Sequence, residues 1–425
     1  MSYQNTKKLT QIALLGLSLV GGAGLTFISQ ALFARTLSPA EYGSLAAAFA
    51  VTRVLSPIAS FGISEFWLAR FGQEGWGAIA WVKPSLETIS FTILIALFLG
   101  GLWAWFGASD KNTSIALILL LPMVAFQSLT SLAVARYQLE ERYNKTSLWA
   151  MIPHVPRLIA ALSAAWLGLG LMGVASMLAA IYALLLAIPV LIIYEMAAGR
   201  LLLVGHGVKD DSAALFRHGT IRDILSNAKW FAASGVFYVL HYQLAIVFLE
   251  VFSGPESAAI YSVAFVVLSA VFLIPTILYR WYMMPKMHRW AWGDSIKLNY
   301  VFQKSLYAVL SLSLIIIAAI VVVSPWVMPF LFGSEYDKSV LVLQLLSPAI
   351  FFRFLAVALG ALMVGKGIVR KKVVLDIYGT SIGLILGVVL IREFSVIGGV
   401  VTTIAIEAML VLLYCRALYS RKRHL

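Results

Sequence analysis

The sequence predicts an all-α protein that crosses a membrane about twelve times. Of its 425 residues, 61% are hydrophobic and only 12% are charged, and the mean hydropathy is +0.92. A soluble chain of this length could not bury so much apolar surface. Apolar segments long enough to span a bilayer, about 20 residues each, also recur along the whole chain between short polar turns. Together these observations predict a polytopic membrane protein.

Six predicted spans make up the N-terminal half. They cover 12–35, 43–68, 85–106, 114–137, 148–167 and 171–194. The first follows the charged start MSYQNTKKLTQ without a small-residue cleavage pattern, so we expect a retained span rather than a removed signal peptide. The turns LSPAEYG, FGASDKN and GLGLMG separate neighbouring spans and are rich in residues that end helices.

Six more spans make up the C-terminal half. They cover 229–252, 257–283, 301–331, 339–364, 372–391 and 396–418, with turns at SGPES and FGSEYD. The longest gap between spans, Glu195 to Ala228, lies midway along the chain. We therefore predict an N-terminal six-helix lobe at 1–200, a cytoplasmic linker at 201–228 and a C-terminal six-helix lobe at 229–425.

The two halves also resemble each other in sequence. When Pro39 is placed on Pro255, SPAEYGSLAAAFAV lies over GPESAAIYSVAFVV, and Phe49 meets Phe265. With six helices in each half, both copies would start on the same side of the membrane. This predicts parallel repeats related by a pseudo-twofold axis along the membrane normal. A chance match of small and apolar residues is the alternative.

Basic residues alternate between the two sides of the predicted topology. One set of loops holds most of them and includes both termini. It contains Lys7, Lys8, Arg70, Lys83, Arg136, Arg142, Lys145, the midway linker, Arg280, Lys286, Arg289, Lys297, GKGIVRKK and SRKRHL. The other set holds Arg35, Lys111, Lys338 and Arg392, each near an acidic residue. By the positive-inside rule, the first set and both termini are cytoplasmic.

Several function classes are excluded by what the sequence lacks. The net charge of +13 follows from the basic cytoplasmic loops, and no folded basic domain is present to bind nucleic acid. The single cysteine, Cys415, permits neither a disulfide framework nor a cysteine metal site. No phosphate-binding loop, HExxH motif or large external catalytic domain occurs. We therefore expect no cofactor, no metal and no enzymatic activity.

Charged residues lie deep in the predicted spans. Arg53, Arg157 and Arg353 fall near mid-span, with Glu407 in the middle of the last span and Glu65 nearer the cytoplasm. A charge at mid-helix costs about 2.5–3.5 kcal/mol on insertion scales, so such groups usually face a protein interior or a watery cavity. The deep charge is net positive, although each arginine could instead be the structural partner of a carboxylate.

Polar residues form stripes on the first two helices of each half. Arg53 shares one helical face with Ser56, Ser60 and Ser64, and Pro57 in the same turn could kink the helix. The other stripes are Gln11, Ser18, Gly22 and Ser29; Ser234, Tyr238 and His241; and Ser262, Ser269, Thr276 and Arg280. These stripes predict a central aqueous cavity. The serines could instead serve helix packing. Arg70, Arg136 and Arg280 lie at cytoplasmic helix ends, where snorkelling to the surface explains them. His154 and His241 could instead form hydrogen bonds in the protein interior.

Two stretches carry a family resemblance. QALFARTLSPAEYGSLAAAFAV and WVMPFLFGSEYDKSVLVLQLLSP resemble helix junctions of the polysaccharide-transport branch of the multidrug/oligosaccharidyl-lipid/polysaccharide exporter superfamily. The resemblance implies a flippase of the bacterial inner membrane that moves undecaprenyl-diphosphate-linked oligosaccharide for O-antigen, lipopolysaccharide or capsule synthesis. It implies contact with membrane lipids and with a polysaccharide polymerase, and an arginine-lined site.

The predicted substrate-binding residues are Arg53, Arg157, Arg353, Ser56 and Ser60, with Glu407 and His241 as candidates for ion coupling. An ion-coupled exporter of small organic cations is the main alternative, which Glu407 keeps open. A membrane enzyme or an assembly scaffold of a polysaccharide synthesis complex is the third hypothesis.

Overall fold

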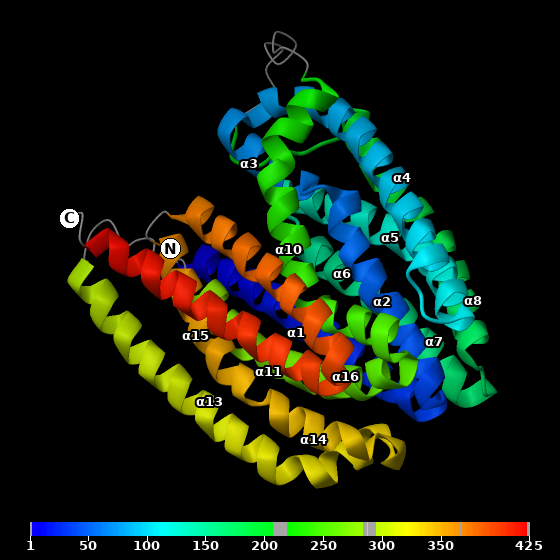
Figure 1. Cartoon of the computed structure of the whole chain (residues 1–425). Coiled ribbons are helices and arrows are strands. Elements are labelled where there is room, and N and C mark those ends of the chain that lie inside the picture. Colours follow the sequence, from blue (N-terminus) through cyan, green and yellow to red (C-terminus); the bar gives the residue numbers. More distant parts are fainter. Residues whose placement is uncertain (1, 207–218, 284–286, 288–294, 366–367, 423–425) are drawn as a thin grey trace. The chain divides into compact units, whose positions relative to one another are not determined.

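The structure is a computed structural model that describes residues 2–206, 219–283, 287, 295–365 and 368–422. Over these residues the chain is helical and contains no strand, which confirms the predicted all-α class. The chain divides into two compact units (Figure 1). Unit 1 comprises residues 1–29 and 48–239, and unit 2 comprises residues 30–47 and 240–425. The lobe boundaries expected from the sequence remain a prediction.

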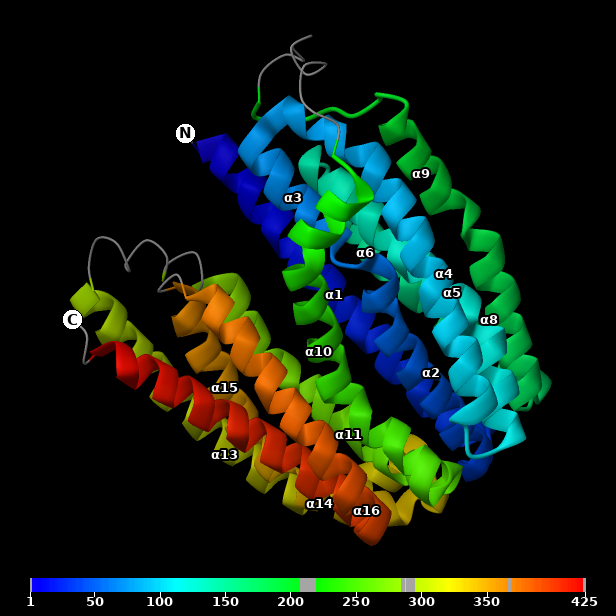
Figure 2. The same cartoon turned by 45° about the horizontal axis from the view of Figure 1, so that its top comes forward.

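Unit 1 is built from helices of the first half together with the start of α10. Its elements are the first part of α1 (Ser2–Thr36), most of α2 (Pro39–Ser60), α3 (Ile63–Glu74), η1 (Gly75–Trp81), α4 (Val82–Phe106), α5 (Lys111–Leu139), α6 (Tyr143–Met151), η2 (Ile152–His154), α7 (Val155–Leu167), α8 (Leu171–Leu185), α9 (Ala187–Ala197) and α10 (Ile221–Ser253) as far as Val239. Helix α5 packs against α4, α8 and α9 (Figure 2).

Unit 2 is built from helices of the second half together with the α1–α2 junction. Its remaining elements are α11 (Pro255–Thr276), η4 (Ile277–Met283, a π-helix), α13 (Ser295–Phe332), η5 (Ser334–Tyr336), α14 (Asp337–Leu346), α15 (Pro348–Gly365) and α16 (Val369–Lys422). Helix α16 is interrupted at Ser395, where φ is +49°, so it consists of two arms. The most extensive helix packing in unit 2 joins α15 to α16, α11 to α14, and α13 to both α14 and α15.

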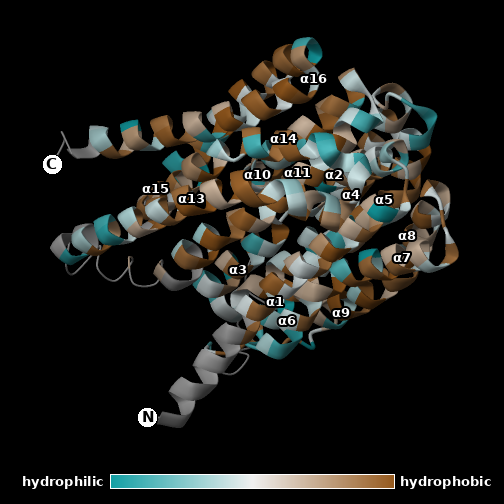
Figure 3. Ribbon diagram, turned by 90° about the horizontal axis from the view of Figure 1, so that it is seen from below, coloured by the Kyte–Doolittle hydropathy of each residue, from teal (hydrophilic) through white to brown (hydrophobic). Residues whose placement is uncertain are grey.

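The described helices account for a multi-pass membrane protein. Nine segments are long and apolar enough to cross a membrane, or ten if the bent pair α14–α15 counts as one span. Two of these segments, 39–106 and 369–420, are 68 and 52 residues long, enough for two crossings each. Ten segments with two double crossings give the twelve predicted spans. Apolar residues run along α8 and α16, as expected of helices in contact with lipid (Figure 3).

Several predicted spans are broken where the sequence suggested one continuous helix. The span expected at 43–68 ends at Ser60, and the chain turns through Phe61 and Gly62, which have φ of +47° and +65°, before α3 begins. Pro57, which could kink the helix, lies within α2, and the break comes after it at Phe61 and Gly62. The spans expected at 148–167 and 339–364 are interrupted next to Pro153 and Pro348, because proline removes a backbone donor from the helix.

The LSPAEYG turn forms the N-terminal cap of helix α2. The Glu41 carboxylate accepts hydrogen bonds from the backbone N–H and the hydroxyl of Ser38, at 3.1 and 3.0 Å, and the Ser38 hydroxyl lies 3.4 Å from the Glu41 N–H. This reciprocal arrangement is a capping box. Helix α2 begins at Pro39 and α11 begins at Pro255, the two residues that the sequence repeat aligns.

Helices α2 and α11 approach each other closely at Gly43. A Cβ atom at this position would lie 1.8 Å from the backbone oxygen of Pro255. Nearby, the Tyr42 hydroxyl donates to Gln30 Oε1 at 2.9 Å, and its ring packs edge-on against Tyr336 at 5.9 Å. Arg35 donates to the backbone oxygens of Leu331 and Phe330. The close approach of α2 to the start of α11 therefore requires a glycine at position 43.

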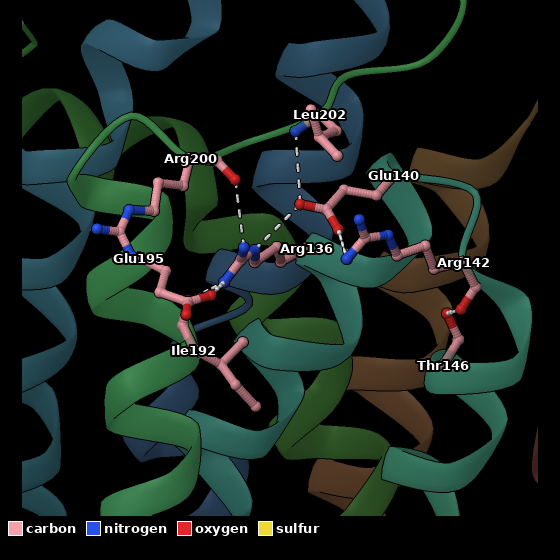
Figure 4. Close-up of polar contacts among 8 residues, drawn as sticks. All are labelled: Arg136, Glu140, Arg142, Thr146, Ile192, Glu195, Arg200 and Leu202. Carbon is pink, nitrogen blue, oxygen red and sulfur yellow. Dashed lines mark hydrogen bonds and ion pairs between the residues drawn. The ribbon is translucent and has the colours of Figure 1, made fainter.

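A buried ion network connects α5, α9 and the chain that follows α9 (Figure 4). Arg136 Nε lies 3.2 Å from Glu140 Oε1, and Arg136 Nη1 lies 3.0 Å from Glu195 Oε2. Arg136 also donates to the backbone oxygens of Ile192 and Arg200, and Arg142 pairs with Glu140 at 3.3 Å. The Arg136 side chain is only 4% exposed. The expectation that Arg136 snorkels to the surface is wrong, because two carboxylates and two carbonyls satisfy its guanidinium inside the protein.

Arg70 is also held by partners. It pairs with Glu74 at 2.8 Å, donates to Asn227 at 2.7 Å and lies over the rings of Phe66 and Trp81. The side chain of Arg280 lies outside the described residues. Residues that the sequence placed in the linker, Leu201, Leu203, Ile224 and Ala228, are buried in the same hydrophobic core as Trp67 and Phe71 of α3.

Replacement of Arg136 by Gln is expected to destabilise the protein strongly. Breaking a buried ion pair leaves an uncompensated charge and costs about 3–5 kcal/mol. We expect a lower melting temperature for the purified protein in detergent. Arg392→Gln is the matched control because Arg392 is exposed. Equal melting temperatures for the two variants would contradict the structural role of the network.

Replacement of Gly43 by Ala is expected to reduce the yield of folded protein, because the added methyl group would collide with the Pro255 backbone. Gly101→Ala is the control, since nothing lies within 4 Å of a Cβ at that helical position. A helical Gly→Ala change alone favours the helix by about 1 kcal/mol. Size-exclusion profiles of the two variants should therefore differ, and identical profiles would rule out the close approach.

Candidate functional site

Two deep charged clusters stand out among the described residues, one in each unit. The cationic cluster in unit 1 comprises Arg53, His154 and Arg157. The Glu407 triad in unit 2 comprises His241, Arg353 and Glu407. The three arginines predicted to bind substrate and the two residues predicted to couple ions therefore lie in one of these clusters. Glu65, the other deep charge, lies in neither and bonds Ser64 on α3.

Local helix geometry places the cationic cluster. Arg53 lies one turn after Phe49 on the same face of α2, and its side chain is half-buried. Pro153 lies within the short η2 turn and Pro156 in the first turn of α7, so His154 and Arg157 project from the junction where one helix ends and the next begins. This junction would not form in a continuous helix.

Arg157 is buried without a carboxylate partner among the described residues. The residue is 3% exposed, and no ion pair of the described residues involves it. Its guanidinium lies 4.8 Å from the centre of the Phe49 ring, and Nη2 lies 3.8 Å from the Met123 sulfur. Its Nε is buried with no hydrogen-bond partner. A cation in this setting is stabilised by an aromatic face and retains an unused donor.

His154 joins the cluster to helix α1. Its Nδ1 lies 2.8 Å from the Thr26 hydroxyl, and the ring fits against Gly22, where a Cβ would come within 2.8 Å of His154 Cδ2. Both Arg53 and Arg157 are close enough to the imidazole to interact with it electrostatically. His154 therefore forms a hydrogen bond in the protein interior, which was one of the alternatives that the sequence allowed for it.

Two neighbours of the cationic cluster were not predicted from the sequence. The Tyr182 hydroxyl of α8 donates to the Pro153 backbone oxygen at 2.9 Å and interacts with Arg157. Thr26 holds the His154 ring. A tyrosine within the apolar run of α8 was a detectable sequence signal, whereas Thr26 was not, because a threonine in a membrane helix usually bonds its own backbone.

Of the two predicted serines, Ser56 lies at a helix contact. Its hydroxyl is 2.7 Å from Gln127 Oε1 of α5 and 2.8 Å from the Thr52 carbonyl oxygen, whereas the Ser60 hydroxyl is 3.5 Å from the Pro57 carbonyl oxygen of its own helix. The Ser56 contact favours the packing alternative for that residue, and the binding role of Ser56 and Ser60 stays a prediction. Ser64 does not continue the face, because the break at Phe61 and Gly62 places it on α3, where it bonds Glu65.

The Glu407 triad brings together side chains from α10, α15 and the second arm of α16. Glu407 Oε1 lies 2.9 Å from His241 Nε2 and 3.6 Å from Arg353 Nη1, and the Glu407 side chain is 1% exposed. The Arg353 guanidinium lies over the rings of Tyr242 and Phe272, at 5.0 and 5.8 Å. The sequence left open whether Arg353 binds substrate or pairs with a carboxylate, and the structure shows the ion pair with Glu407.

The two clusters differ in charge. Arg353 and Glu407 balance each other, whereas Arg157 has no acidic partner among the described residues. The cationic cluster can therefore attract an anion, and the arginine fork suits phosphate oxygens. No group of three or more His, Cys, Asp or Glu residues within the described ranges could hold a metal ion.

Solved structures share this fold over nearly the whole chain. The lipid II flippase MurJ, in an inward closed conformation, has a TM-score of 0.67 at 14% identity, covering 96% of this chain and 87% of its own. An inward-facing multidrug resistance MATE family transporter of the MOP superfamily has a TM-score of 0.64 at 16% identity, covering 97% and 94%. A MOP superfamily transporter from Pyrococcus furiosus, described as having a binding pocket of reverse polarity, has a TM-score of 0.60 at 16% identity, covering 97% and 95%.

A search of curated proteins gave no match. The family described as "Polysaccharide biosynthesis protein" matches residues 9–278, well over half of the chain. The protein therefore belongs to the polysaccharide biosynthesis protein family, and the resemblance to the polysaccharide-transport branch of the exporter superfamily is confirmed.

Proposed function

We propose that this protein is a flippase that moves undecaprenyl-diphosphate-linked oligosaccharide from the cytoplasmic to the periplasmic leaflet of the bacterial inner membrane. It would act by alternating access, with both termini in the cytoplasm, and would supply O-antigen, capsule or exopolysaccharide synthesis. The observation that carries the proposal is the cationic cluster of Arg53, His154 and Arg157, in which a buried arginine has no carboxylate partner among the described residues.

The chemistry of a diphosphate matches this cluster. A diphosphate diester carries about two negative charges, and arginine binds phosphate oxygens through short charge-assisted hydrogen bonds. Such bonds strengthen where water is partly excluded. Arg157 offers its unused Nε donor, and the Phe49 ring keeps the guanidinium plane in place. Arg53 adds positive charge, and His154 adds hydrogen-bonding capacity, from two further elements.

The oligosaccharide and the lipid tail of the substrate need fewer specific contacts with the protein than the diphosphate does. Hydroxyl groups of the oligosaccharide can bond to water and to polar side chains, and the lipid tail can remain in the bilayer. The chain has no motif for ATP hydrolysis. We therefore propose that transport is driven by an ion gradient, with His241 and Glu407 as the coupling residues, or by consumption of the product on the far side by a polymerase.

An exporter of small organic cations is the second candidate, because MATE transporters share the fold and Glu407 is a deep carboxylate. The pairing of Glu407 with Arg353 and His241 argues against it, since a carboxylate already bonded to a cation attracts a second cation weakly. A membrane enzyme or scaffold is the third candidate.

Arg157→Gln is expected to abolish surface polysaccharide while the protein level is maintained. Losing a hydrogen bond to a charged group costs about 1.5–3 kcal/mol, so binding of undecaprenyl diphosphate should weaken by about tenfold or more. Arg53→Gln should act in the same direction. Arg392→Gln is the control for the loss of a positive charge. Normal polysaccharide in the Arg157 variant would contradict the proposal.

Reconstitution should separate transport from chemistry. In proteoliposomes, labelled lipid-linked oligosaccharide is expected to reach the opposite leaflet chemically unchanged. Turnover of the labelled sugar would support an enzyme instead. Loss of drug resistance in a Glu407→Gln strain, with surface polysaccharide intact, would support the cation exporter.

A further inference from the structure

Arg353 pairs with the carboxylate of Glu407, whereas no ion pair among the described residues involves Arg157. We infer that Glu407 is an internal counter-ion that competes with an anionic ligand for Arg353, so that Arg353 is a gated contact for a diphosphate within unit 2. The inference rests on the proposed function and deepens it, because it assigns Glu407 a role in substrate release. The evidence is the geometry of the triad.

Glu407 is attached at one oxygen only. Oε1 accepts from His241 Nε2 at 2.9 Å and lies 3.6 Å from Arg353 Nη1, whereas Oε2 is buried with no hydrogen-bond partner. The longer of the two contacts is the one to Arg353, and it exceeds the usual length of a charge-assisted hydrogen bond. The carboxylate can therefore give up Arg353 and still keep its bond to His241.

The aromatic surroundings hold Arg353 in place independently of Glu407. Its guanidinium lies 5.0 Å from the centre of the Tyr242 ring and 5.8 Å from that of Phe272. Tyr242 in turn packs against Phe265 at 6.2 Å and Phe272 at 6.3 Å. A guanidinium supported on two rings remains oriented when its ion-pair partner moves. The Arg353 side chain is 11% exposed, against 1% for Glu407, so the arginine is the member that a ligand can reach.

The surroundings of Glu407 suit an anion better than a metal cation. Arg353 and His241 both act electrostatically on Glu407. A metal cation would need several oxygen ligands, and here one carboxylate lies beside an arginine. A phosphate would replace the carboxylate with a ligand of the same sign and similar geometry. When the ligand leaves, Glu407 can return to Arg353, which avoids an unpaired buried charge.

A double-mutant cycle tests this competition directly. Binding of undecaprenyl diphosphate is measured on the purified full-length protein in detergent for wild type, Glu407→Gln, Arg353→Gln and the double variant. Glutamine keeps an oxygen to accept from His241 but has no charge to hold Arg353. We expect Glu407→Gln to bind about tenfold more tightly than wild type, a value typical of coupling between sites. In the Arg353→Gln background, the same change should have no effect.

The outcomes separate this inference from the proposed function. If Arg157→Gln weakens binding but Glu407→Gln does not tighten it, only the counter-ion role is overturned. If Arg157→Gln leaves binding unchanged, the proposed function itself fails. The melting temperature of each variant shows whether it is folded. The double variant removes both charges and should therefore be at least as stable as Glu407→Gln. Tighter binding in Glu407→Gln that persists without Arg353 would also overturn the inference. Inorganic pyrophosphate should compete with the probe if the headgroup is what binds.

Discussion

The cost of placing a charge in a low-dielectric interior is the constraint on which the rest of this structure depends. Three arginines that are buried or largely buried meet it in three ways. Arg136 has two carboxylates and two backbone carbonyls within reach, Arg353 has one carboxylate and two aromatic rings, and Arg157 has a ring, a thioether and a tyrosine. The number of negative partners decreases from the first to the last. A structural role therefore suits Arg136, and an anion-binding role suits Arg157.

The same constraint explains where the helices break. In a membrane every backbone polar group needs a partner, so an interrupted helix is tolerated only where neighbouring protein surrounds it. The η2 turn (Ile152–His154) is such a place, because the Tyr182 hydroxyl donates a hydrogen bond to the Pro153 carbonyl oxygen. The break also positions His154 and Arg157. Helix irregularity and charge burial thus occur together in unit 1.

Much of the fold followed from the sequence, since spans of about 20 apolar residues and basic loops are dictated by the bilayer. The starts of α2 and α11 at Pro39 and Pro255 agree with the repeat read from the chain. The break at Phe61 and Gly62 could not be predicted, because positive φ depends on the packing of Gly62 against Phe231 and Ala232 of α10. That contact joins residues far apart in the sequence.

For the candidate site, the sequence by itself determined which charges lie deep, because apolar neighbours on both sides of Arg53, Arg157, Arg353 and Glu407 leave no other place for them. Only the tertiary structure decided their partners. Arg353 meets Glu407, 54 positions away in the chain, while Arg157 meets Phe49 and no acid among the described residues. Pairing depends on which helix faces pack together, and packing is set by the small residues and bends of every helix at once. For this reason the depth of each charged residue in the membrane could be predicted from its own segment, whereas its interaction partner could not.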